Sequence, residues 1–90
     1  MKLYLITNPI CGSEQFNSMV VLAKNAQSAR LINPFSEGEE VVRFIGPGEN
    51  MVGAWPKYDE LDSLIVTFLG NGVRQLGTKP KIIITSPSSA

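Results

Sequence analysis

The stretch FNSMVVLAKNAQSARLINP, residues 16 to 34, predicts a strand followed directly by a short helix. Phe16 to Ala23 is rich in apolar and β-branched residues, which favours a strand. Asn25 is a predicted helix N-cap, because its side chain can accept a hydrogen bond from an amide of the first turn. Small and apolar residues then follow at helical spacing. Pro34 predicts the end of a helix of about two turns, because the residue before proline disfavours the α region.

The remaining strands are predicted on both sides of this stretch. Lys2 to Thr7 is apolar on both faces, which is typical of a central strand, and an antiparallel hairpin with residues 16–23 is the simplest pairing. Further strands are predicted at 41–45, 64–69 and 81–85, and 51–55 is a fourth strand or an ordered loop. The sequence thus predicts an α+β fold, an antiparallel sheet of four to five strands with one short helix packed on one face. We expect a single domain over residues 1–86 and a flexible tail at 87–90.

Composition excludes several classes of protein. Apolar residues make up 43% of the 90 residues and charged residues 18%, which is typical of a globular domain. Eight basic and eight acidic residues cancel, which does not favour a nucleic-acid partner. A single cysteine, Cys11, cannot form an internal disulfide, and no apolar run approaches the ~20 residues of a membrane span. We therefore expect a cytoplasmic protein that does not enter a membrane.

Charge is unevenly distributed along the chain. Residues 37–62 contain seven acids and two bases, a net charge of −5, whereas residues 71–90 contain three bases and no acid, a net charge of +3. Three of the acids stand within PKYDELD, which has two interpretations. They could bind a cation or act as general acid and base, but the spacing of a calcium loop is absent. They could instead favour the N-terminus of a short helix that begins at Pro56, and we favour this second interpretation.

Other candidate sites are weaker. The chain has no histidine, which excludes Ser-His-Asp and Cys-His catalysis and histidine metal sites. Cys11 has no neighbour in the sequence that would activate a thiol. GPGENMVG, residues 46–53, lacks the Lys-Ser/Thr of a phosphate-binding loop. Trp55 is either a core residue, which we favour, or an interface anchor. We therefore expect no catalytic residue, no metal site and no cofactor.

Several segments taken together resemble a group of small bacteriophage proteins of unknown function. These segments are KLYLIT, FNSMVVLAKNAQSARLINP, Trp55 with DELDSLIVTFLG, and IIITS. The matching positions are Ser18, Val20, Val21, Ala23, Ala29, Arg30, Pro34, Trp55, Gly70 and the strand Ile82 to Ser86, and the chain departs from the group at GTKPK. The group brings no catalytic residues. It implies an accessory phage protein that binds a host protein, and anti-CRISPR proteins are one such class.

The first functional hypothesis is a non-enzymatic phage protein that inhibits or modulates a host protein, with a CRISPR effector complex as one candidate partner. An acidic surface would present carboxylates to a basic channel. The expected contact residues are Glu37, Glu39, Glu40, Trp55, Asp59, Glu60 and Asp62. The alternative is a small nucleic-acid-binding accessory domain that uses a sheet face and the basic C-terminal region. An unpaired sheet edge would also allow a homodimer by strand addition.

Overall fold

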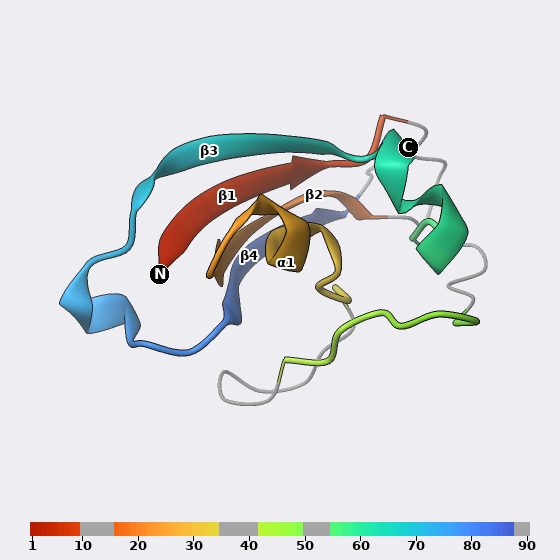
Figure 1. Ribbon diagram of the computed structural model, residues 1–90. Coiled ribbons are helices and arrows are strands. Elements are labelled where there is room, and N and C mark those ends of the chain that lie inside the picture. Colours follow the sequence, from red (N-terminus) through yellow and green to blue (C-terminus); the bar gives the residue numbers. More distant parts are fainter. Residues whose placement is uncertain (10–15, 35–41, 50–54, 88–90) are drawn as a thin grey trace.

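A computed structural model describes residues 1–9, 16–34, 42–49 and 55–87. The described residues form a small α+β fold in which four strands make one antiparallel sheet (Figure 1). The predicted fold class is therefore confirmed. In chain order the elements are β1 (Lys2–Thr7), β2 (Phe16–Ala23), α1 (Ala26–Arg30), the 3-10 helix η1 (Tyr58–Ser63), β3 (Ile65–Asn71), the 3-10 helix η2 (Arg74–Leu76) and β4 (Lys81–Pro87).

The sheet has the strand order β3-β1-β2-β4, so β1 and β2 are central and β3 and β4 lie at the edges. All three pairings are antiparallel, and the register of the hairpin sets Tyr4 opposite Val21 and Ile6 opposite Met19. Residues directly opposite one another in an antiparallel pair point to the same face. These four side chains therefore form one continuous apolar surface, and the predicted central position of residues 2–7 is confirmed.

α1, η1 and residues 42–49 lie on the face of the sheet that carries this surface (Figure 1). Ala29 and Ile32 from the helical segment, Ile45 from the following segment, and Leu61 and Leu64 around η1 complete the core. Each of these residues is nearly or fully buried. The core thus lies between the sheet and a layer of short segments. Because each segment is short, it contributes only one or two apolar residues.

α1 begins where the sequence predicts. Asn25 has an extended backbone and its Oδ1 accepts a hydrogen bond from the Ser28 N–H at 2.8 Å, which confirms the N-cap. The helix ends at Arg30, earlier than expected, because the chain then pairs with residues 42–49. The Asn33 N–H donates to the Arg43 carbonyl at 3.0 Å, and the Ile45 N–H donates to the Leu31 carbonyl at 2.6 Å. These bonds satisfy main-chain groups that a longer helix would have paired internally.

Other expectations about the elements are wrong. Residues 42–45, within the strand expected at 41–45, form only an isolated antiparallel bridge between Ile32 and Phe44 and do not join the sheet. The helical turn expected to begin at Pro56 begins at Tyr58 as a 3-10 helix. The strand expected at 64–69 begins at Ile65 and continues through Gly70 to Asn71 as β3, with a register shift opposite Leu3 and Tyr4. Gly70 has a φ of +145°, which glycine adopts without strain.

The other face of the sheet has no helix against it in the described ranges (Figure 1). Leu3, Leu5 and Val20 are half-buried there, whereas Ile84 is 62% exposed. Leu22 is fully buried because the chain end closes over it, with the Gly72 N–H donating to the Met1 carbonyl at 2.9 Å. A Cβ at position 72 would approach the Leu22 Cδ1 methyl group to 2.6 Å and the Met1 carbonyl oxygen to 3.1 Å, so a larger residue there would displace Leu22.

The described ranges cover only part of two other predicted segments, the C-terminal tail and the strand or loop at 51–55. β4 extends to Pro87, so the first residue of the expected tail belongs to the sheet, and the remaining tail residues lie outside the described ranges. Residues 51–54 of the optional fourth strand also lie outside them. Among the described helices, none has the length and apolar character that crossing a bilayer demands.

The burial pattern predicts a large difference between two isoleucines. Ile6→Ala should lower the free energy of unfolding by about 2–5 kcal/mol, because it leaves a cavity beneath a central strand. Ile84→Ala removes the same atoms from an exposed position and should lower it by less than about 1 kcal/mol. Urea denaturation followed by circular dichroism measures both values. Equal losses would contradict the assignment of the core to one face.

Candidate functional site

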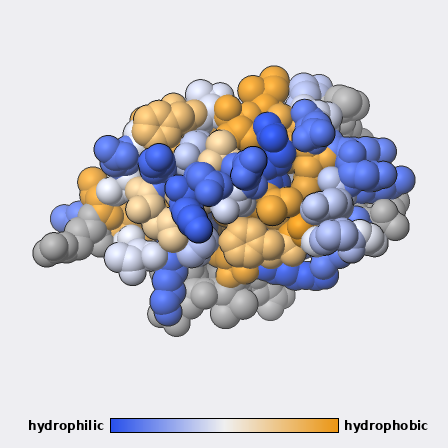
Figure 2. All heavy atoms as spheres, viewed as in Figure 1, coloured by the Kyte–Doolittle hydropathy of each residue, from blue (hydrophilic) through white to orange (hydrophobic). Residues whose placement is uncertain are grey.

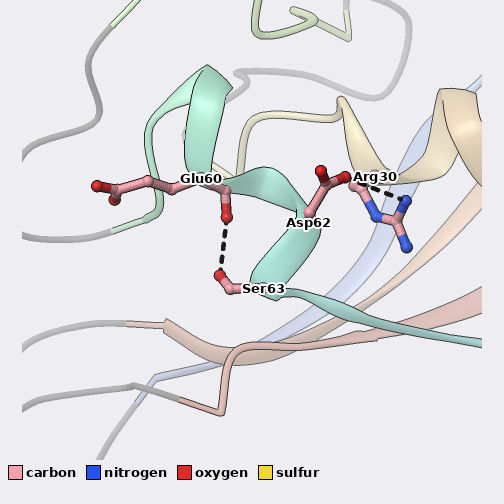
Figure 3. Close-up of polar contacts among 4 residues, drawn as sticks. All are labelled: Arg30, Glu60, Asp62 and Ser63. Atoms are coloured by element: carbon pink, nitrogen blue, oxygen red, sulfur yellow. Dashed lines mark hydrogen bonds and ion pairs between the residues drawn. The ribbon is translucent and has the colours of Figure 1, made fainter.

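η1 carries the three carboxylates of the DELD segment on a single 3-10 helix. Its buried residue is Leu61, and Leu64, which follows η1, is also buried, so both anchor the turn on the core. The Leu64 N–H donates to the Leu61 carbonyl at 3.1 Å, and the Ser63 hydroxyl donates to the Glu60 carbonyl at 2.8 Å (Figure 3). Because Leu61 and Leu64 face the core, the polar side chains of η1 face the solvent.

Asp59, Glu60 and Asp62 are all exposed, and Tyr58 beside them is also exposed. We call these four residues the acidic η1 surface. Hydrophilic side chains gather over η1 at the right of the view in Figure 2. Glu60 extends away from the fold and Asp62 turns toward α1 (Figure 3). The N-terminal position of Asp59 and Glu60 in the turn is the arrangement that the sequence predicts for acids near a helix start.

Asp62 links this surface to α1 through an ion pair with Arg30. Its Oδ1 lies 3.9 Å from Arg30 Nη1, while its side chain is 99% exposed (Figure 3). An ion pair this long and this solvated contributes little to stability. Arg30 is more enclosed, and its Nε is buried without a hydrogen-bond partner in the part of the chain that the structure describes. The guanidinium group therefore keeps donor capacity that Asp62 does not use.

A shallow groove of about 380 Å³ separates α1 from η1. Its walls combine one cation, two carboxylates, an aromatic ring and aliphatic carbon. The lining residues are Gln27, Arg30, Leu31, Tyr58, Asp59, Leu61 and Asp62. A groove with this lining is suited to an extended side chain, with a charged end for the carboxylates and an aliphatic stem for the ring.

Glu49, another acidic residue of the region 37–62, is paired within the fold. Glu49 Oε1 lies 3.2 Å from Arg43 Nη2, and the Glu49 side chain is about one third exposed. The Glu49 carbonyl also accepts a hydrogen bond from the Tyr58 N–H at 3.3 Å. Glu49 therefore positions the start of η1 against residues 42–49 and is less available to a partner than Asp59 or Glu60.

The structure brings together only part of the predicted contact set. Asp59, Glu60 and Asp62 share one surface, whereas Glu37, Glu39 and Glu40 lie outside the described residues. Trp55 is 2% exposed and belongs to the core cluster, which confirms the core alternative and removes it from the contact surface. Its indole Nε1 is buried without a hydrogen-bond partner among the described residues, so packing holds this ring in place.

Sequence reasoning did not find the α1 side of the groove. Arg30 and Gln27 lie about thirty residues before η1, and nothing in local spacing links them to it. Arg30 is the last residue of α1, a position that favours a cation by itself and so gave no functional signal. Over the described ranges, no group of three or more His, Cys, Asp or Glu side chains is arranged to hold a metal ion.

Comparisons of the chain with protein-family models, with curated proteins and with solved structures found no match. The resemblance to small bacteriophage proteins therefore stays a prediction.

The two sides of η1 should respond differently to substitution. Leu61→Ala should lower the free energy of unfolding by about 2–4 kcal/mol, because it removes the buried anchor of the turn. Asp62→Asn should leave the denaturation midpoint unchanged, because its ion pair is long and solvated. Urea denaturation measures both, and hydrogen exchange at the Leu64 amide reports whether η1 itself loosens. A large destabilisation by Asp62→Asn would contradict the assignment of this residue to a free surface.

Proposed function

We propose that this chain is a small non-enzymatic protein that acts by binding another protein through the acidic η1 surface. The observation that carries the proposal is the exposure of Asp59, Glu60 and Asp62 on one rigidly anchored turn beside a groove. A preformed charged surface binds with little ordering cost, since the turn is already fixed by Leu61 and Leu64.

The favoured partner is a protein with a basic surface. Within the described ranges, neither Asp59 nor Glu60 makes an ion pair, so both carboxylates are available to lysine or arginine side chains. Opposite charges speed association and select against acidic partners. The exposed Tyr58 ring adds a face on which an arginine or lysine can stack.

The biological setting of the proposal comes from the resemblance. It implies a bacteriophage protein in the host cytoplasm, with a CRISPR effector complex as one candidate partner. Carboxylates on η1 would then occupy a basic site that otherwise binds nucleic acid, which inhibits or modulates the partner. Glu37, Glu39 and Glu40 would extend the same contact by the sequence prediction.

The test compares partner capture by two variants. Asp59→Asn with Glu60→Gln removes two exposed charges and keeps Asp62, which contacts Arg30. We expect a tagged chain to capture a basic protein from a bacterial host lysate in a salt-sensitive manner, and this variant to bind that protein at least about tenfold more weakly by calorimetry.

The matched control is Lys24→Gln with Lys79→Gln, which changes the same number of exposed charges elsewhere on the surface. It should bind as the parent chain does. Equal binding by the parent and the Asp59/Glu60 variant would contradict the proposal. Retention of DNA or RNA at low salt by the purified chain, weakened by Lys79→Gln and not by the Asp59/Glu60 variant, would instead support the nucleic-acid alternative.

A further inference from the structure

β3 leaves one side of its backbone open. It lies at the end of the sheet, and its seven residues pair only with β1 in the described part of the chain (Figure 1). None of the turn and loop hydrogen bonds between described residues reaches Ile65–Asn71. An edge strand with free N–H and C=O groups is a template for another strand.

The side chains of β3 are those of an interior strand. Ile65, Phe68 and Leu69 are 53%, 56% and 50% exposed, respectively. Phe68 lies on the covered face, where its ring centroid is 5.8 Å from that of Tyr4, whereas Ile65, opposite Thr7, lies on the other face. Leu69 stands at the register shift and has no partner in β1. Apolar side chains also reach the surface along the upper edge of Figure 2, which β3 occupies in Figure 1. Apolar residues on both faces are typical of strands with neighbours on both sides.

The two edges of the sheet differ in protection. β4 begins with Lys81 and ends with Pro87, and a lysine and a proline both discourage pairing at an edge. The β3 sequence, IVTFLGN, contains neither a charged residue nor a proline. Both edge strands contain a register shift, so the lysine and the proline of β4 are what leave the open edge of β3 as the one that favours a partner strand.

Charge along the chain specifies which partner strand fits. Asp59, Glu60 and Asp62 precede β3, whereas residues 63–90 contain Arg74, Lys79 and Lys81 and no acid. β3 thus runs from an acidic end to a basic end. A second β3 in the antiparallel direction places the acidic end of one copy beside the basic end of the other, and a two-fold axis makes this match twice.

We propose that this protein forms a homodimer by antiparallel pairing of β3 with β3 of a second copy. Pairing centred on Phe68 sets Ile65 opposite Asn71 of the partner and joins the two sheets into one of eight strands, four from each copy. The end of η1 then lies beside the start of η2 in the partner. Main-chain hydrogen bonds and a few apolar contacts bury a small area, so the dimer dissociates in roughly the micromolar range.

This inference shares Asp62 with the proposed function but is tested separately, because its readout is molecular mass. Sedimentation velocity over a micromolar to millimolar series should show twice the 9.8 kDa mass of one chain at the upper end. Leu69→Lys places a charge at the proposed contact and should raise the dissociation constant at least about tenfold. Ile84→Lys makes a similar change on β4, where the side chain is 62% exposed, and should leave the constant unchanged.

A charge exchange tests the antiparallel direction without altering β3. Asp62→Arg alone and Arg74→Asp alone should each weaken the dimer, and the double variant should recover most of the loss. Asp62 is 99% exposed, so its replacement leaves the core intact.

Three outcomes would overturn the proposal. The first is a monomer at every concentration. The second is a dimer that Ile84→Lys disrupts as strongly as Leu69→Lys, because that result would place the contact on β4 or on the sheet face without helices. The third is a double variant as weak as the sum of the two single ones, which excludes the antiparallel charge match. Circular dichroism of Leu69→Lys must match that of the parent chain, and if that variant unfolds, the charge exchange decides alone.

Discussion

The apolar surface of the β1–β2 hairpin must be covered, and the rest of the structure depends on this constraint. Ile6, Met19 and Val21 lie on adjacent strands and point to one face, where exposure to water would be unfavourable. No single long helix is present among the described residues to cover them. Several short segments do so instead, and each is held by a buried residue such as Ala29, Ile45 or Leu61.

This division of the covering layer explains where polar groups accumulate. A turn that buries one leucine presents its remaining side chains to water, so η1 exposes its carboxylates because Leu61 is buried. The groove beside it exists because α1 and η1 are separate short pieces whose contact is incomplete. The exposed carboxylates of η1, on which the proposed protein binding depends, thus result from the way the core is covered.

The same sheet leaves its two edges in different chemical states. β1 and β2 take the central positions, so β3 and β4 each have a neighbour on one side only among the described strands. β3 joins an acidic segment to a basic segment, so its charges favour an antiparallel direction relative to a second copy. The acidic surface binds a basic partner through side-chain carboxylates, whereas the edge of β3 pairs with a second copy mainly through main-chain groups, and Asp62 belongs to both contacts.

Local sequence by itself determined the elements that depend on neighbours along the chain. The strands at 2–7 and 16–23, the N-cap at Asn25 and the fold class follow from apolar patterning and capping chemistry, which act over a few residues. Tertiary structure decided what depends on distant partners. Residues 42–45 are no strand because they bridge to residues 31–33 outside the sheet, and Trp55 is a core residue because the surrounding layer encloses it. Arg30 meets Asp62 only after the chain has folded, since the pairing of residues far apart carries no local signature.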